Sequence, residues 1–314
     1  MDEHFHQSKK LSKEKLIVLM QKNNHPALLH FLVMFILFLA AGVWAVIAWN
    51  NTWWELLLSQ LFFGVMCCST FASLHETAHG TAFKSKSLNN IAAILVGIAH
   101  IYPATAFREL HFMHHRHTHI PGLDPEISLG TKPAPSVIGS LPFYLSWLSG
   151  FPLLSFKIFM LLMGALGMPN VIRKLYFPFV HEKVRWKLAL DSWVVLSVHL
   201  IFLYLAIFVN SSLWALFLGQ VVGHCILAFY LTPEHNGLPH DGDILNKTRS
   251  FSVNHFVRIL MWNMPYHAEH HAYPAVPFHA LPKLHEEIIG ELKHKDQKHA
   301  EFHFKVLTGK IGRN

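Results

Sequence analysis

Cysteine is scarce in this sequence of 314 residues. Its three cysteines, Cys67, Cys68 and Cys225, all lie inside uncharged apolar runs. Their number and positions argue against a four-thiolate iron–sulfur cluster, a zinc ribbon and the disulfide framework of a small secreted protein. We therefore interpret the cysteines as packing residues.

Charge is scarce as well. Charged residues make up 14% of the chain and hydrophobic residues 52%. Four apolar runs are long enough to cross a bilayer core about 30 Å thick at about 1.5 Å per helical residue. The sequence therefore predicts an all-α integral membrane protein with four transmembrane helices, at 27–49, 56–74, 192–209 and 213–231.

Short turns without charge join the first two runs, at 50–52, and the last two, at 210–212, so each pair is expected to form a hairpin. The lysines and arginines gather instead in the N-terminal segment, in the middle segment at 173–187 and in the tail. Because such residues stay on the cytoplasmic side, both termini and the middle segment are predicted to be cytoplasmic. The formal net charge of +7 is then mainly a topology signal and not a sign of nucleic-acid binding.

Two further apolar stretches, 91–107 and 137–167, contain prolines and are expected to be interfacial or re-entrant. A single span at either stretch would place the basic middle segment in the wrong compartment. We divide the chain into a cytoplasmic amphipathic segment at 1–26, a membrane domain at 27–285 and a cytoplasmic basic tail at 286–314. No secretory signal peptide, internal repeat or low-complexity linker is evident.

Histidine, by contrast, is abundant, with 26 residues. Eight of them form three clusters beyond apolar stretches, on the predicted cytoplasmic side: His75 and His79 in HETAHG, His111, His114 and His115 in HFMHH, and His267, His270 and His271 in HAEHH. Residues three or four apart share one face of a helix, and neutral imidazole is the commonest protein ligand of transition metals. Crowding eight imidazoles without a metal would leave polar groups unsatisfied or protonated beside one another. The clusters therefore predict a metal site with a histidine-rich cap, whereas isolated histidines elsewhere are interpreted as caps or surface groups.

Eight or more imidazoles exceed the ligands of one ion, because a structural zinc takes four and a catalytic zinc takes three plus water. We therefore expect two metal ions with four or five imidazoles each. Five nearby carboxylates are candidate acceptors for the free N–H of a ligating histidine, although an ordinary surface role suits each of them equally well. They are Glu76, Glu109, Glu126, Glu234 and Glu269.

In this order and across four spans, HETAH, HFMHH and HAEHH resemble the three histidine boxes of the membrane fatty acid desaturases and of the related hydroxylases, carotene ketolases and alkane hydroxylases. The resemblance covers about residues 27–285. The phrases GLDPE at 122–126 and MPYHAEHHAYPAVPFHALPKLH at 264–285 are more similar to bacterial acyl desaturases than to carotenoid or alkane enzymes. We therefore expect a multi-pass protein of a bacterial inner membrane with its active site on the cytoplasmic face.

The resemblance implies two iron ions, with O2 as co-substrate. One iron would be held by His75, His79, His115 and His271, and the other by His111, His114, His267 and His270. His235 in TPEHNG matches a further ligand of the second iron in the acyl-CoA desaturases. Those enzymes place an asparagine four residues earlier, which reaches the first iron through water. Here that position is Leu231, which leaves the fifth position of this iron open to water or substrate, and His117, His119 and His240 are not expected to be ligands.

No module for electron delivery is evident, because the sequence lacks a Gly-rich nucleotide fingerprint, a cysteine cluster and a heme-binding HPGG stretch. A separate ferredoxin or cytochrome b5-like donor is therefore expected. The basic segment 173–187 would suit an acidic donor, although the positive-inside tendency explains its charges equally well. The apolar spans are expected to form a slot that fixes which methylene meets the metals.

The expected function is the O2-dependent insertion of a double bond into a lipid acyl chain. A di-iron hydroxylase acting on a lipid or another hydrophobic substrate is the alternative, because it shares every ligand and diverges only after the first hydrogen is removed. A metal transporter is disfavoured, since it would place its ligands at mid-membrane depth. Only His199, Gln220 and His224 lie deep in the predicted spans.

Overall fold

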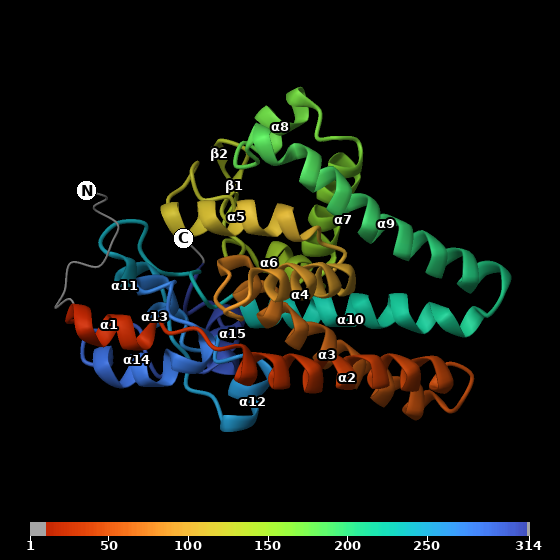
Figure 1. Cartoon of the computed structure of the whole chain (residues 1–314), viewed down its shortest axis with the longest axis horizontal. Helices are drawn as coiled ribbons and strands as arrows, with labels where there is room; N and C mark the ends of the chain where they lie inside the picture. Colours follow the sequence, from red (N-terminus) through yellow and green to blue (C-terminus); the bar gives the residue numbers. More distant parts are fainter. Residues whose placement is uncertain (1–10, 313–314) are drawn as a thin grey trace.

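The computed structural model describes residues 11–312, which form a mostly helical protein (Figure 1). Four of its helical segments are long and apolar enough to cross a membrane. They are α2 (Asn24–Ala48), α3 (Trp53–His79), the segment Glu182–Phe208, which joins η1 (Glu182–Val184) to α9 (Arg185–Phe208), and the segment Ser211–Leu231, which joins η2 (Ser211–Leu213) to α10 (Trp214–Leu231). Each overlaps one of the four predicted spans, which confirms a helical chain with spans of transmembrane length and composition.

Two further helix pairs are apolar enough to be spans but are sharply bent. The bend is 100° between α4 (Lys86–Ala99) and α5 (Ala104–His117), and 61° between α6 (Leu141–Leu148) and α7 (Phe151–Ala165). At the first bend Ile101 has a φ of 54° and Pro103 precedes α5; at the second, Gly150 has a φ of 70°. Left-handed backbone and proline both interrupt a helix, so the two stretches predicted as interfacial or re-entrant are broken helices.

The central helix of the molecule is α3. It packs against α2, α4 and α10, and 67% of its apolar stretch is buried, compared with 22% for the segment that contains α9. A capping box of Thr52 and Glu55 begins α3, and Gly80, with a φ of 67°, ends it directly after His79. The helix therefore continues beyond the predicted end at residue 74, and the first histidine cluster belongs to its last turns.

Close approach between α3 and α10 depends on small residues. A Cβ atom added at Gly219 would lie 2.0 Å from Cδ1 of Phe63, and one added at Gly223 would lie 2.8 Å from Cβ of Cys67. Glycine permits helices to approach this closely. Cys67 is fully buried at this contact, in agreement with its interpretation as a packing residue.

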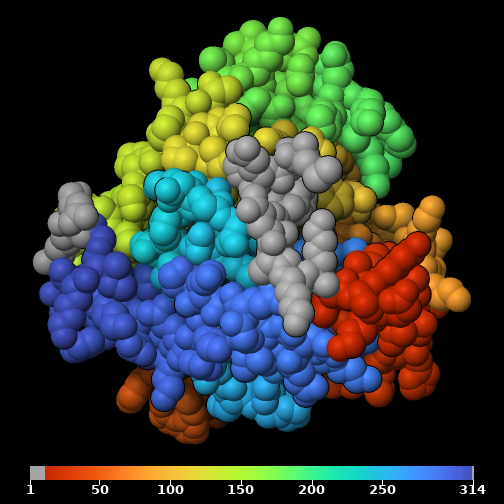
Figure 2. Space-filling view, turned by 90° about the vertical axis from the view of Figure 1, so that its left-hand side faces the viewer, coloured from red at the N-terminus to blue at the C-terminus, as the bar shows by residue number. Residues whose placement is uncertain are grey.

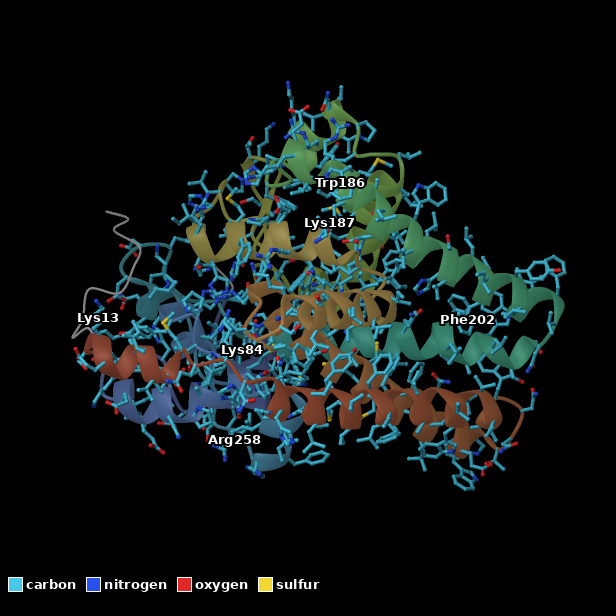
Figure 3. The ribbon with its side chains drawn as sticks, viewed as in Figure 1. Lys13, Lys84, Trp186, Lys187, Phe202 and Arg258 are labelled. Carbon is cyan, nitrogen blue, oxygen red and sulfur yellow. The ribbon has the colours of Figure 1, made fainter. Side chains whose placement is uncertain are left out.

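The outward faces of the membrane-length helices are apolar. Ile36 on α2 and Phe208 on α9 are each more than half exposed. In Figure 3 the side chains around Phe202 consist mainly of carbon atoms, whereas side chains with nitrogen atoms lie around Lys13, at the opposite end, and around Lys187. Large exposed apolar surfaces of this kind suit contact with lipid.

Most of the short elements gather at the end opposite the turns that join α2 to α3 and α9 to α10 (Figure 1). The remaining elements are α1 (Lys13–Leu19), β1 (Ser128–Leu129), β2 (Lys132–Pro133), α8 (Asn170–Tyr176), α11 (Ile244–Lys247), α12 (His255–Leu260), α13 (His267–Ala272), η3 (Phe278–Ala280), α14 (Leu281–Ile288) and α15 (His299–Leu307). Figure 2 shows this end, where the C-terminal third of the chain forms much of the surface and α1 lies beside it. Lys15 on α1 donates a hydrogen bond of 2.6 Å to Glu287 on α14, which joins the two ends of the sequence.

A buried carboxylate ties α9 to α5. Oδ2 of Asp191 accepts a hydrogen bond of 2.9 Å from the backbone N–H of Thr105 and a second from its hydroxyl. The first N–H groups of a helix have no partner within the helix, so this carboxylate fixes the start of α5. The same helix carries the middle histidine cluster.

Candidate metal centre

The clustered histidines lie at the ends of three helices. His75 and His79 occupy the last turns of α3, and α5 ends with the turns that carry His111, His114 and His115. The third cluster fills α13, which His267 begins. A turn in which Trp262 and Asn263 have φ values of 49° and 59° leads into α13 and directs its histidines toward the other two clusters.

The first imidazole group contains five histidines, each with one nitrogen within 4.8 Å of the others. They are His75, His79, His111, His115 and His270, and we call them the five-histidine group. Nε2 of His79 lies 2.7 Å from that of His111, and Nε2 of His270 lies 3.1 Å from that of His79 and 3.2 Å from that of His115. Imidazole nitrogens from three helices therefore converge on one point.

The second group contains His114, His235 and His271, and we call it the three-histidine group. The Nε2 atoms of His114 and His271 are 3.3 Å apart. His267 lies at its edge, with its Nε2 2.9 Å from Nε2 of His235. All nine histidines predicted as ligands therefore lie in or beside one of the two groups.

Their division between the groups differs from the one that the resemblance implied. His111 and His270 lie with the five-histidine group, whereas His271 lies with the three-histidine group. The reason is helical geometry, because residues four apart share a face and neighbours point about 100° apart. His111 therefore accompanies His115, and His271 turns away from His270 toward His267.

In the three-histidine group, Nδ1 of each ring contacts a residue outside the group, and this contact orients the ring. Nδ1 of His114 lies 3.0 Å from both carboxylate oxygens of Asp124, and Nδ1 of His235 donates to the carbonyl oxygen of Lys247 at 2.8 Å. Nδ1 of His271 lies 3.2 Å from the hydroxyl oxygen of Thr118. A proton on Nδ1 leaves the lone pair of Nε2 available to a metal, which is the usual arrangement around ligating histidines.

The predicted carboxylate acceptors take other positions. A carboxylate oxygen of Glu126 lies 3.6 Å from Nδ1 of His114, and one of Glu234 lies 3.7 Å from Nδ1 of His267. Both distances are too long for a hydrogen bond. The others accept from elsewhere: Glu76 from Thr81, Glu109 from the backbone of His181, and Glu269 from Ser250 and His285. Asp124, which sequence reasoning missed, is a carboxylate that hydrogen bonds to a histidine of the two groups. Its signal was its place in GLDPE, shortly after the HFMHH cluster.

Burial favours the neutral form of four of the histidines that lie beyond the spans. It lowers the pKa of His235, His267, His270 and His271 well below the usual value, and the neighbouring imidazoles lower it further. Burial also raises the pKa of the Glu234 carboxyl well above its usual range. Neutral imidazoles are the form that binds metals.

The nitrogen atoms of the five-histidine group are arranged to bind a cation. Both ring nitrogens of His75 and Nδ1 of His270 are buried without a hydrogen-bond partner within residues 11–312. Buried polar atoms without partners are costly, and a metal ion would satisfy the converging lone pairs. An all-imidazole ligand set suits iron as well as zinc or copper, so the residues present fit the iron that the resemblance implies.

An apolar cavity of about 800 Å³ adjoins both groups. Its wall includes His75 and His111 from the first group, His114 and His235 from the second, and aromatic residues such as Phe107. A cavity of this size and lining suits a hydrocarbon chain. The arrangement would therefore bring such a chain against the imidazole groups.

The remaining histidines that sequence reasoning singled out lie outside both groups. Nδ1 of His119 donates to the carbonyl oxygen of Pro239 at 2.9 Å, and Nδ1 of His240 donates to the carbonyl oxygen of His119 at 3.0 Å. Neither group includes His117. Deep in the spans, His199 lies 3.1 Å from Nε2 of Gln220. Within residues 11–312, no metal-binding group of three or more residues lies at that depth.

Comparison with known proteins identifies related sequences. The family model described as fatty acid desaturase matches residues 51–303. The sphingolipid delta(4)-desaturase of Candida albicans is 27% identical over 242 residues, which cover 74% of this chain and 62% of that protein. The enzyme of the same name from Schizosaccharomyces pombe is 25% identical over 74% of this chain and 61% of its own. A sphingolipid delta(4)-desaturase/C4-monooxygenase of Mus musculus is 24% identical over 79% and 70%. The chain spans about three fifths of the length of the first two relatives.

Proposed function

Because the chain belongs to the fatty acid desaturase family, we propose that it is a membrane oxidoreductase that uses O2 to insert a double bond into the hydrocarbon chain of a lipid. The observation that carries this proposal is the presence of two imidazole groups in the wall of one apolar cavity. The several helices of membrane-spanning length agree with a lipid substrate that reaches the site from the bilayer.

Two iron ions would occupy the imidazole groups. The five-histidine group would hold one, and the three-histidine group together with His267 would hold the other. When bound, iron supplies the change of oxidation state and the activation of O2 that side chains alone cannot provide. Leu231, where the resemblance implies an asparagine, lines the cavity, and five imidazoles at the first site would make that asparagine unnecessary.

The residues of this chain would bind, orient and shield the substrate. Phe71, Phe107 and Leu110 line the cavity next to the histidines and exclude water from it. Their fixed positions would determine which methylene groups approach the metals, since a hydrocarbon chain offers no polar handle of its own. Asp124 and Thr118 would hold the rings of His114 and His271 in the ligating orientation.

We propose two transmembrane hairpins, α2 with α3 and α9 with α10, below a cytoplasmic histidine-rich cap, with 1–26, 27–285 and 286–314 as segment, membrane domain and tail. A separate ferredoxin or cytochrome b5-like protein would deliver electrons to the cytoplasmic face. The relatives are eukaryotic and give no support to a bacterial inner membrane, which stays a prediction.

The substrate class separates two versions of the proposal. The sequence motifs favoured a fatty acyl chain, whereas the relatives are named for sphingolipids and for a double bond at position 4. A hydroxylase is the second candidate function. It is favoured by the names of two relatives, from Caenorhabditis elegans and Mus musculus, which include C4-monooxygenase beside desaturase.

Lipid analysis in a host that expresses the chain tests these versions together. Desaturation removes two hydrogens from a saturated lipid and hydroxylation adds one oxygen, so mass spectrometry distinguishes the products. Fatty acyl lipids and sphingolipids are analysed separately, and a His75→Ala variant provides the inactive control. A new double bond that depends on His75 supports the proposal. An iron-loaded chain that is supplied with electron donor and yields neither product would contradict it.

A further inference from the structure

A lysine without an acidic partner is buried in the wall of the cavity. Lys157 lies on α7, is 1% exposed, and lines the cavity together with Phe71 and Tyr102. Among the described residues, no Asp or Glu forms an ion pair with it. Burying an amino group is costly unless its N–H groups find acceptors, so the surroundings of Nζ indicate what the residue does.

Within residues 11–312, a single nitrogen acceptor lies within hydrogen-bond distance of Lys157. Nζ is 3.2 Å from Nε2 of His224. Nδ1 of His224 donates to the carbonyl oxygen of Gln220 at 2.7 Å, so the neutral ring presents a lone pair at Nε2. The other neighbours are ring faces, with centroids 5.7 Å away in Phe71 and 5.5 Å away in Tyr102. These faces attract a cation, but the remaining N–H groups have no oxygen or nitrogen acceptor among the described residues.

The hydroxyl of Tyr102 is a second unsatisfied polar group in the same wall. The residue is 3% exposed and lines the cavity, and its hydroxyl has no hydrogen-bond partner in the described part of the chain. Buried hydroxyl groups are normally hydrogen bonded. Because Nζ of Lys157 lies over the ring of Tyr102, the two residues form one polar patch of unused donors.

This polar patch adjoins the metal centre. The ring of Tyr102 contacts that of Phe107 with centroids 5.4 Å apart, and Phe107 stacks on His111 at 5.1 Å. The ring of Phe71 faces Nζ of Lys157. Phe71 precedes His75 by about one turn of α3, which is a rise of about 6 Å along the helix axis. A group held at the patch would therefore lie near the carbons that reach the imidazoles and not at a remote end of the lipid.

We infer that Lys157 and Tyr102 bind a hydrogen-bond-accepting oxygen of the lipid substrate, and that this oxygen fixes the register of the hydrocarbon chain at the metal centre. The identity of the substrate as a lipid rests on the proposed function. Hydroxyl, amide and carboxylate oxygens share the required chemistry, because each accepts hydrogen bonds from an amino group and a phenol. Such a contact places one position of the hydrocarbon chain at the metal centre. An entirely apolar slot discriminates poorly between neighbouring positions.

Equilibrium binding of three saturated probes of equal length tests the inference. Octadecane has no oxygen, octadecanol has a neutral oxygen and octadecanoate has an anionic one. Binding is measured with the purified, iron-loaded full chain at a fixed detergent concentration. We expect Tyr102→Phe to weaken binding of an oxygen-bearing probe about 2- to 10-fold and Lys157→Met about 10- to 100-fold, with octadecane unaffected.

Tyr230→Phe is the matched control. Tyr230 is 7% exposed and its hydroxyl is also buried without a hydrogen-bond partner in the described part of the chain, but the residue does not line the cavity. This variant should bind all three probes like the parent. Thermal unfolding provides a second check, because removing the unpaired hydroxyl of Tyr102 should leave the midpoint unchanged or higher.

The pattern across the probes decides the outcome. If Lys157→Met loses more affinity for octadecanoate than for octadecanol, the oxygen bound at the patch is anionic. If it loses the same affinity for both probes, the oxygen is neutral. Both results support the polar patch. An equal loss of affinity for all three probes, including octadecane, or no loss of affinity for any probe, would overturn the inference.

A desaturation assay on the same proteins separates this result from the proposed function. Selective binding by a chain that forms no double bond would refute the function and retain the patch. A double bond at one position in the parent and in both variants, without a change in probe selectivity, would retain the function and refute the patch.

Discussion

The two imidazole groups differ in what holds their rings in place. In the three-histidine group, Nδ1 of each ring has an acceptor or hydroxyl outside the group, from Asp124, Lys247 or Thr118. In the five-histidine group, no Nδ1 atom has a hydrogen-bond partner within residues 11–312. Its rings are instead packed edge to face, as in the pairs His75 with His111 and His79 with His270, whose centroids are 4.4 and 4.6 Å apart.

This difference shows two ways to position metal ligands. The three-histidine group depends on side chains and carbonyls that fix each tautomer, so a single remote substitution should disturb it. The five-histidine group depends on the packing of α3, α5 and α13, so it should resist such substitutions but not the loss of a ligand itself. Substitutions that act on one group and spare the other therefore test the distinction directly.

The largest effect is expected from His270→Ala. Nε2 of His270 approaches both His79 and His115, so its loss opens the centre of the five-histidine group. We expect the variant to insert into the membrane normally, to lose the iron of this group and to lose activity entirely. Iron analysis, activity and membrane fractionation measure these effects, with His181→Ala, an exposed histidine outside both groups, as the control. Full turnover by His270→Ala would disprove the assignment.

An intermediate effect is expected from Asp124→Asn. The amide cannot reproduce the two carboxylate oxygens at Nδ1 of His114, so the three-histidine group should bind its metal about 10- to 100-fold more weakly. Titration with a chelator measures this affinity for each group. Glu126→Gln is the matched control, because Glu126 stays 3.6 Å from the same nitrogen and should matter less. Equal weakening of both groups would show that they are not held independently.

The smallest effect is expected from Thr118→Val. The hydroxyl of Thr118 donates to the carbonyl oxygen of His114 at 2.9 Å and thus accepts from Nδ1 of His271. Losing this neutral hydrogen bond should weaken metal binding at the three-histidine group about 2- to 10-fold. Thr118→Ser keeps the hydroxyl and should restore the affinity. If serine fails to restore it, the methyl group of Thr118 and not its hydrogen bond positions His271.

Features that depend on nearby residues could be predicted from the sequence. The four spans follow from uninterrupted apolar runs, and the three histidine clusters follow from spacing along single helices. Both are present in the structure. Their exact ends could not be predicted, since α3 ends where Gly80 adopts a left-handed conformation and not where its apolar run ends.

Features that depend on contacts between distant segments could not be predicted. Spacing within a cluster pairs His111 with His115 and His267 with His271, but which pair joins which group depends on the rotation of α13 relative to α5. Asp124 reaches His114 because its chain turns back, with Oδ2 accepting from the backbone N–H of His119 at 2.7 Å. Lys157 and Tyr102 come together only through the bends that follow Ile101 and Gly150.

The link between Asp191 and Thr105 connects the lipid environment to the ligands on α5. Only 22% of the apolar stretch of the segment containing α9 is buried, so most of that helix lies against its surroundings. Helices tilt when the hydrocarbon thickness of a bilayer changes, and a tilt of α9 would pull on the start of α5 through this one carboxylate. We therefore expect turnover to vary with the chain length of the surrounding lipids even when the substrate and electron supply are held constant.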